Sequence, residues 1–186
     1  YVHKVPVGLS KDGEITGWLH RIVGQSIVTG TPFESALVKD GIDGTSVEGV
    51  SDTPYAIPNM QVELHTVSAG PRPLWWRSVG HTHTAYVMET MIDEIATAVG
   101  KDPVAFRLAL LEKHPRHVGV LKLAAEKAGW DTPPPEGVFR GVAVHESFKS
   151  FVAEVADVRI VDGTPKVERV VAAVDCGLAI NPDNIK

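Results

Sequence analysis

The chain has a single cysteine, Cys176, among its 186 residues. One cysteine excludes an internal disulfide and any cysteine-ligated cluster within the chain. No apolar run approaches the ~18 residues that a transmembrane helix needs. Lysine and arginine number 18 against 23 acidic residues, and a net charge of −5 gives no electrostatic reason to expect nucleic acid. The Gly-x-Gly-x-x-Gly fingerprint of dinucleotide-binding folds is also missing.

The composition is that of a folded globular chain, with 44% hydrophobic and 22% charged residues. The length suits one ordinary domain or two small layers that share a core. The sequence begins at Tyr1, within residues that already read as a strand, and it ends at Lys186 just after an Asn-Pro turn. We therefore expect an internal piece of a longer polypeptide.

The first part of the chain carries strand and loop signals. Residues 1–9 and 14–24 predict a β-hairpin, because Asp12-Gly13 between them supplies the positive φ of a tight turn. Residues 30–58 are rich in Gly, Ser, Thr and Asp and predict a long irregular segment. Residues 59–67 alternate apolar and polar side chains, which predicts another strand.

Three helices are expected next. Apolar residues at helical spacing predict a first helix that Thr82 or Thr84 caps and that runs to about Val99. A second should begin at the Asp-Pro pair 102–103, which offers an N-cap and a proline at the first helical position. Pro115 should stop it. A third is expected over about 116–128, closed by a glycine.

The last fifty residues are rich in β signals. Residues 138–144, 151–161 and 167–174 predict strands, and Asp162-Gly163 predicts a hairpin turn between the last two. The nearly continuous apolar run 170–174 suggests a strand covered on both faces. The expected class is α+β, with mixed or antiparallel sheet hairpins and about three helices packed on one side.

The run Trp75-Trp76-Arg77-Ser78-Val79-Gly80 is the most unusual feature. An arginine and a Ser-Val-Gly turn before a helix can offer backbone N–H groups and a fixed positive charge at the helix N-terminus. An anion or a polarised oxygen is readily held there. The residues alone leave a second reading open, in which Arg77 stacks on Trp75 or Trp76 and pairs with a carboxylate.

Several ordered motifs carry a resemblance to a known family. They are Arg77-Ser78-Val79-Gly80, Glu89, Asp93-Glu94, Asp102-Pro103-Val104-Ala105-Phe106-Arg107, Gly141-Val142-Ala143-Val144-His145-Glu146-Ser147-Phe148, Val174-Asp175-Cys176-Gly177 and Asn181-Pro182-Asp183. In this order they resemble the molybdopterin-binding large subunit of the xanthine dehydrogenase/aldehyde oxidase family, most closely its branch of isoquinoline 1-oxidoreductase beta subunits. The likeness runs from roughly Gly13 to the last residue.

The resemblance implies that residues 1–186 are a fragment of a molybdenum-cofactor-binding domain. Within it, 1–70 would form the hairpin and irregular loop, 71–130 the cofactor-proximal loop and helices, and 136–186 the β-rich part. The parent protein would be a molybdenum hydroxylase, an oxidoreductase that hydroxylates an N-heteroaromatic or aldehyde substrate with water-derived oxygen. Its cofactor would be molybdenum–molybdopterin, in the plain or the cytosine dinucleotide form.

The resemblance also implies a small [2Fe-2S] partner subunit, a cytoplasmic or periplasmic location, no nucleic-acid partner and no transmembrane segment. The general-base glutamate of the family and its glycine- and glutamine-rich pterin loops have no counterpart in residues 1–186. The fragment alone is therefore expected to be inactive and to bind no cofactor. A non-catalytic assembly module in a diverged relative is the alternative.

Site residues follow from the same resemblance. Arg77 would lie at the molybdenum centre and stabilise negative charge that develops on oxygen. Trp76, Ser78 and Gly80 would form the cofactor-binding loop with it, and no side chain of the chain would ligate the metal. Val79 would face the substrate where purine-oxidising relatives carry a phenylalanine, which puts a purine substrate in doubt.

Other reactive residues have ordinary explanations. His81 and His83 form an HxH pair, but no further ligand lies at zinc-site spacing and the eight histidines look scattered. Surface or capping roles are favoured for both. Cys176 is expected to be a small buried residue, and Ser147 lacks the Gly-x-Ser-x-Gly context of a hydrolase nucleophile.

Glu89 and Asp93 lie four residues apart and share one helix face. Ion pairs with arginines such as Arg77 or Arg107 are favoured over acid–base catalysis at this pair. A second rival function, a hydrolase or metal-binding enzyme that uses His81, His83 and Glu89, is left open at this stage.

Overall fold

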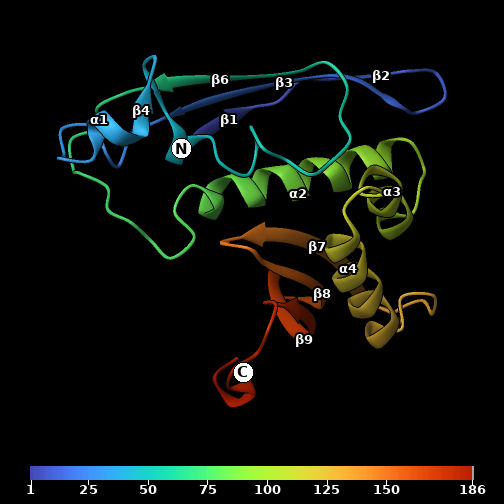
Figure 1. Cartoon of the computed structure of the whole chain (residues 1–186). Coiled ribbons are helices and arrows are strands. Elements are labelled where there is room, and N and C mark those ends of the chain that lie inside the picture. Colours follow the sequence, from blue (N-terminus) through green and yellow to red (C-terminus); the bar gives the residue numbers. More distant parts are fainter. Residues whose placement is uncertain (186) are drawn as a thin grey trace. The chain divides into compact units, whose positions relative to one another are not determined.

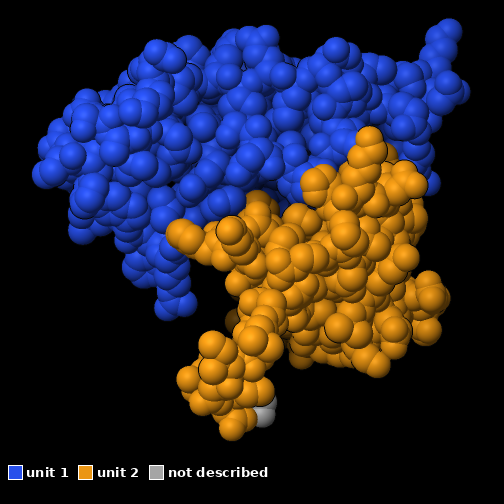
Figure 2. Space-filling view, in the orientation of Figure 1, with its two compact units in different colours: residues 1–101 blue, residues 102–186 orange. Residues whose placement is uncertain are grey.

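The computed structural model of the chain describes residues 1–185. It divides into two compact units, residues 1–101 and residues 102–186, shown in different colours in Figure 2. Each unit combines a sheet with helices, so the expected α+β class is confirmed. Among the described residues, no helix has both the length and the hydropathy needed to cross a bilayer.

The sheet of the first unit is built around its longest strand, β3. The strands are β1 (Val2–Lys4), β2 (Val7–Leu9), β3 (Ile15–Gly24) and β6 (Met60–Thr66). Both β1 and β2 pair antiparallel with β3 and β6 pairs parallel with it. The hairpin and the strand predicted at 59–67 are confirmed, and the turn glycine Gly13 has a φ of 76°.

Helix α2 (His81–Ala98) lies along one face of this sheet, as Figure 1 shows. Met88, Ile92 and Ile95 recur at helical spacing and are at most 4% exposed. Trp18 and Ile22 of β3 are equally buried. The helix forms because these side chains share one stripe that can leave water together with the sheet.

The predicted irregular segment contains several short elements. They are α1 (Glu34–Leu37), β4 (Val38–Lys39), β5 (Ile42–Asp43) and the 3₁₀ turn η1 (Gly44–Ser46). The buried carboxylate of Asp43 orders this region, since it accepts hydrogen bonds from the hydroxyls of Ser26, Thr45 and Ser46 at 2.6–3.1 Å. Elements of two to four residues are too short for sequence periodicity to reveal.

The second unit packs helices against an antiparallel sheet. Its elements are α3 (Pro103–Leu110), α4 (Pro115–Ala128), β7 (Val138–Ser147), β8 (Ser150–Val161), β9 (Thr164–Asp175) and the 3₁₀ turn η2 (Pro182–Asn184). The strand order is β7-β8-β9, and α4 contacts all three strands. The three strands and both helices predicted in this part of the chain are confirmed.

The ends of these helices follow the local signals with one exception. The Asp102 side chain accepts a hydrogen bond from the Ala105 N–H at 2.8 Å, so Asp102 is the N-cap of α3 as predicted. Gly129 ends α4 with a φ of 69°. Pro115 was expected to stop α3, but α3 has already ended at Leu110 and the proline begins α4. Proline suits the first helical position equally well, which is why both roles were compatible with the sequence.

Two burial predictions for the C-terminal part are wrong. The run 170–174 is covered on one face only, since Val171 and Ala173 are partly or fully buried whereas Val170, Ala172 and Val174, which alternate with them, are exposed. Val170 and Val174 are 51% and 47% exposed. Cys176, expected to be buried, is exposed. A short apolar run cannot by itself distinguish a strand covered on both faces from one covered on a single face.

Truncation of Leu121 should destabilise the chain much more than truncation of Leu123. Both residues lie on α4, but Leu121 is fully buried whereas Leu123 is 46% exposed. Leu121→Ala leaves a cavity and is expected to lower the free energy of unfolding by roughly 2–5 kcal/mol. Leu123→Ala should lower it by less than about 1 kcal/mol. Urea titrations of both variants check this, and equal losses would contradict the observed packing.

Candidate functional site

The loop before α2 holds two non-glycine residues in the left-handed region. Arg77 has a φ of 33° and Val79 has a φ of 54°. Backbone hydrogen bonds maintain this shape, from Val79 N–H to the Trp76 oxygen at 2.8 Å and from His81 N–H to the Ser78 oxygen at 3.0 Å. Such conformations cost about 1–3 kcal/mol each and cluster at functional sites. The loop is thus a strained feature that its surroundings keep in place.

Gly80 fixes this loop to the turn at η1. Its N–H donates to the Glu48 carboxylate at 2.6 Å, and a Cβ added here would overlap the carbonyl oxygen of Thr45. The Thr84 hydroxyl donates to the backbone oxygen of Glu48 at 2.8 Å. The prediction that Thr82 or Thr84 caps α2 is wrong, since the N-cap residue is Gly80. Glu48 supplies the negative charge at the helix N-terminus instead.

The residues predicted for the cofactor loop are only partly brought together. Trp76, Val79 and Gly80 line a cavity of about 180 Å³, with Tyr1 and His83 also on its wall. Ser78 is half-buried beside it. Arg77 is exposed and does not line this cavity.

The second reading of Arg77 does not match its surroundings. Within residues 1–185 its guanidinium has no hydrogen bond, ion pair or ring contact. Trp75 instead meets Phe33 edge to face, with ring centroids 5.8 Å apart. Arg77 therefore neither stacks between the tryptophans nor pairs with a carboxylate in the described part of the chain.

Glu89 is buried at 6% exposure and accepts a hydrogen bond from the Tyr55 hydroxyl at 2.6 Å. It does not pair with Arg77, one of the two arginines expected as partners. A pair between Glu89 and Arg107 stays a prediction. In the described residues, no group of three or more His, Cys, Asp or Glu side chains is arranged to hold a metal ion. The geometry therefore gives no support to the metal-enzyme reading of His81, His83 and Glu89.

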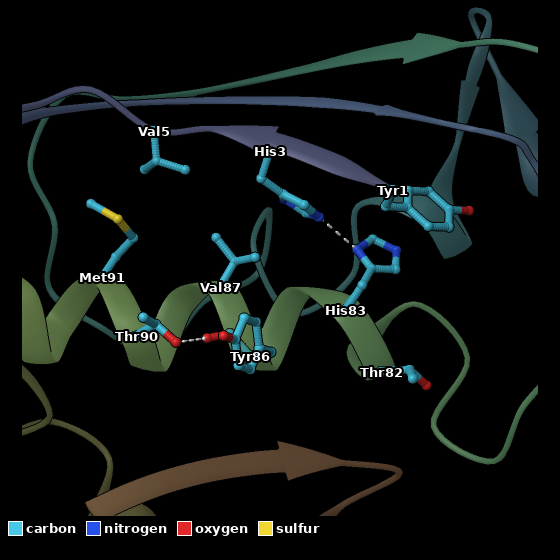
Figure 3. A pocket seen from close by; sticks show the side chains of 9 residues that line it. All are labelled: Tyr1, His3, Val5, Thr82, His83, Tyr86, Val87, Thr90 and Met91. Carbon is cyan, nitrogen blue, oxygen red and sulfur yellow. Dashed lines mark hydrogen bonds between the residues drawn. The ribbon is translucent and has the colours of Figure 1, made fainter. Parts of the chain in front are cut away.

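Sequence reasoning missed a cluster of three histidines. His3 from β1, His20 from β3 and His83 from α2 meet in a row, with Nδ1 of His3 2.8 Å from Nε2 of His20. Nε2 of His3 lies 3.0 Å from Nδ1 of His83. Figure 3 shows His3 and His83 facing each other at the wall of a cavity of about 510 Å³. The view that the histidines are scattered is wrong for these three, and no local spacing could have revealed a contact between residues so far apart.

The three imidazoles are held neutral by burial. Burial, together with repulsion from the neighbouring His3, lowers the pKa of His20 to about 4. Burial also lowers the pKa of His83 to about 4, with repulsion from His3 as the next cause. The pKa of His3 is lowered for the same first reason. At neutral pH the row therefore carries no charge and each ring has one N–H donor and one acceptor.

The second unit contains an ion pair whose acidic partner, Asp175, belongs to one of the motifs that carry the family resemblance. Arg116 on α4 donates to both carboxylate oxygens of Asp175 at 2.7 Å and stacks on the Phe151 ring at 4.0 Å. This hydrogen bonding, with help from the Gly177 N–H, lowers the pKa of Asp175 to about 2. The pair joins α4 to the end of β9, a structural role that the sequence did not indicate.

A methyl group at position 80 should disrupt the loop. Gly80→Ala forces the new Cβ against the Thr45 carbonyl, and we expect the free energy of unfolding to fall by roughly 1–3 kcal/mol. Gly119→Ala on α4 is the matched control, because nothing lies within 4 Å of its added Cβ. That variant should be as stable as the parent or up to about 1 kcal/mol more stable. Thermal unfolding of the two variants decides, and a stable Gly80→Ala protein would refute the role given to Gly80.

Acidification should destabilise the fold before the carboxylates titrate. Two buried histidines, His20 on β3 and His117 on α4, have a pKa of about 4 in the folded chain against about 6.5 in the unfolded chain. Their contribution is complete above about pH 6.5 and is lost as the pH falls towards 4, because only the unfolded chain takes up the proton. Each should cost roughly 1–3 kcal/mol across this window.

Urea titrations at about pH 7 and about pH 4.5 measure this loss. His20→Gln is the control, since a glutamine cannot titrate and should reduce the pH dependence. An unchanged pH dependence in that variant would show that His20 does not keep a lowered pKa.

Residues 1–111 match the family of molybdopterin cofactor-binding domains, which is more than half of the chain. The chain is 29% identical over 203 aligned positions to the B subunit of nicotinate dehydrogenase from Pseudomonas putida, covering 96% of this chain and 17% of the relative. It is 30% identical over 137 positions to the beta subunit of isoquinoline 1-oxidoreductase from Brevundimonas diminuta, covering 71% and 18%.

A third relative is the membrane-bound aldehyde dehydrogenase (pyrroloquinoline-quinone) of Gluconacetobacter polyoxogenes, 29% identical over 136 positions, which cover 62% of this chain and 18% of the relative. The chain thus spans less than a fifth of the length of these curated relatives. The segment that matches the family contains the strained Arg77–Gly80 loop and the histidine row. This chain belongs to the family of molybdopterin cofactor-binding domains.

Proposed function

We propose that the loop from Trp75 to Gly80 forms part of the cofactor wall in a molybdenum hydroxylase. The enzyme would hydroxylate an N-heteroaromatic or aldehyde substrate with oxygen derived from water. The observation that carries this proposal is the loop itself, a strained turn beside a cavity within the segment that matches the family. Left-handed residues such as Arg77 and Val79 persist where a specific geometry is needed.

The donor groups of this loop suit an anionic cofactor. The Arg77 guanidinium is positively charged and has no partner within residues 1–185. The backbone N–H groups of Arg77 and Ser78 also have no acceptor in the described part of the chain. A guanidinium together with free N–H groups in a tight turn binds phosphate-like or oxyanion groups well. Molybdopterin carries such groups, so the residues present fit it.

When bound, the molybdenum cofactor supplies the redox chemistry and the transfer of oxygen. Trp76, Arg77, Ser78 and Gly80 would hold it, and Val79 would face the substrate. Arg77 would stabilise negative charge that develops on oxygen in the transition state, where a fixed cation in a dry site is most effective. Trp76 would contribute a large aromatic side chain to the wall of the cavity.

The substrate class is inferred from the relatives. Two of their names contain nicotinate or isoquinoline, which are N-heteroaromatic, and the third contains aldehyde. Val79 offers no ring for stacking, and this argues against a purine held between aromatic faces. Two relatives are named as subunits. This supports a partner subunit here, which we expect to carry [2Fe-2S] clusters, while the cofactor is expected in the plain or cytosine dinucleotide form.

The full-length protein, purified with its partner, should contain stoichiometric molybdenum and pterin. Arg77→Ala should lower turnover by about 10²–10³-fold, the usual effect of removing one donor that stabilises developing charge. Arg72→Ala is the matched control, since this exposed arginine lies shortly before the loop and donates only a long 3.3 Å hydrogen bond to Gly30. The control should keep full turnover.

Metal analysis, pterin fluorescence and steady-state kinetics measure these quantities. If Arg77→Ala retains both cofactor and turnover, the electrostatic role of Arg77 is wrong. A wild-type protein without molybdenum or pterin, from a host that makes the cofactor, would instead favour the non-catalytic assembly module.

A further inference from the structure

The histidine row has a defined direction that starts at Trp18. The indole N–H of Trp18 can only donate, and it lies 3.4 Å from Nδ1 of His20. Nδ1 of His20 must therefore accept, and the single hydrogen of the neutral ring lies on Nε2. Trp18 is 2% exposed and His20 is fully buried, so water does not compete for this contact.

The hydrogen positions on the other two rings of the row follow for the same reason. Nε2–H of His20 donates to Nδ1 of His3 at 2.8 Å, which leaves the hydrogen of His3 on its Nε2. That group donates to Nδ1 of His83 at 3.0 Å. The hydrogen of neutral His83 must then lie on Nε2. One donor at Trp18 thereby fixes the tautomers of three imidazoles in sequence.

The row ends on a donor that has no acceptor. Nε2 of His83 is buried, and no hydrogen-bond partner for it exists among residues 1–185. The ring cannot turn freely, because Tyr1 stacks on it at 3.8 Å with an interplanar angle of 12° and His3 holds its other nitrogen. Figure 3 shows the imidazole packed against Tyr1, with Nδ1 turned towards His3. Buried polar groups almost always have a partner, so a fixed N–H without one indicates a missing acceptor.

The cavities beside His83 indicate what kind of acceptor is missing. His83 lines both the 180 Å³ cavity at the Arg77–Gly80 loop and the 510 Å³ cavity against β1. In the described structure no Asp, Glu, Lys or Arg side chain lines either cavity. Both walls are mainly apolar or aromatic, including Trp76 and Val79 at the loop. In the cavity at the loop, the hydroxyls of Tyr1, Thr45 and Thr82 already donate within the chain, so the His83 N–H is a buried donor left for a ligand. A mainly apolar wall with such a neutral donor favours a planar, uncharged ligand with an acceptor atom.

We propose that Nε2–H of His83 donates a hydrogen bond to a ring nitrogen or carbonyl oxygen of a neutral N-heterocycle that occupies the cavity at the Arg77–Gly80 loop. The inference rests on the proposed function, which supplies two sources of such a ring. One is the pterin of the cofactor and the other is the substrate. His83 is then a binding residue of the same site, on the cavity wall that it shares with Val79.

The tautomer is tested directly by ¹⁵N NMR of histidine-labelled full-length protein at neutral pH. We expect one imidazole with a protonated Nε2 and a hydrogen-bonded, unprotonated Nδ1, and this signal should disappear in His83→Gln. In Trp18→Phe, which removes the first donor, the signal should broaden or shift as the tautomers exchange. A His83 signal with the hydrogen on Nδ1 would overturn the proposal.

Two variants test the acceptor. His83→Leu removes the donor and keeps a similar volume, whereas His83→Gln keeps an N–H donor near the position of Nε2. The control is His65→Leu, since His65 is a half-exposed residue on β6 that lies near Glu63 rather than a cavity. Pterin retained through dialysis and the dissociation constant of isoquinoline, by calorimetry, are measured for the wild type and all three variants.

If the pterin is the partner, His83→Leu should lose pterin roughly 3- to 10-fold more readily, and His83→Gln should restore retention. If the substrate is the partner, pterin retention should stay equal and the dissociation constant of isoquinoline should rise by a similar factor. No difference in either quantity between the wild type and His83→Leu overturns the proposal.

A wild-type protein without pterin would refute the proposed function. The NMR signal and isoquinoline binding would then test the role of His83 separately. Weaker isoquinoline binding by His83→Leu would support it in that case. Equal binding, or none by either protein, would overturn it.

Discussion

The arrangement of the first unit depends on how the N-terminus of α2 is held. The Glu48 carboxylate accepts a hydrogen bond from the Gly80 N–H, and the Glu48 backbone oxygen accepts one from the Thr84 hydroxyl. One residue therefore holds the first turn of α2 through two hydrogen bonds. Because Gly80 has no Cβ, the chain can approach Thr45 closely enough for this to happen. The strained Arg77 turn lies just before this anchor and His83 just after it. A loop and a histidine that serve one cavity are therefore positioned by a single set of contacts.

Buried polar groups give the unit its specificity. The Asp43 carboxylate accepts hydrogen bonds from three hydroxyls, and the Tyr55 hydroxyl donates one to Glu89. The three histidines of the row are hydrogen-bonded to one another. Each of these groups loses water on folding, and the lost solvation is offset only when every donor meets an acceptor. The row meets this condition at every position except Nε2 of His83. That exception lies at the cavity wall, where a ligand can supply the acceptor, which is where functional sites commonly depart from the rules of a stable core.

The elements of the fold were largely predictable, because their signals are local. Asp12-Gly13, Asp102-Pro103 and Gly129 act through φ preferences and capping within a few residues, and each was placed correctly. The errors concern burial and partner choice. Val170 and Val174 were expected to be covered, but they lie on the face of β9 that is exposed. The cap of α2 was assigned to a threonine within the helix, whereas a glutamate distant in sequence supplies the charge. Local spacing reveals neither which face of a strand another element covers nor a hydrogen bond between residues distant in sequence.

The sequence by itself determined the α+β class and the order of the elements. It also indicated the loop at Arg77 as the candidate site, since ordered motifs around it resemble one family. Only the tertiary structure decided which side chains meet there. Trp76, Val79 and Gly80 share a cavity wall, while Arg77 is exposed beside it. His3, His20 and His83 come from three separate segments and become neighbours only when β1, β3 and α2 pack together. Secondary structure is encoded over a few residues, but the burial that sets a tautomer or lowers a pKa exists only after distant segments have excluded water from one another.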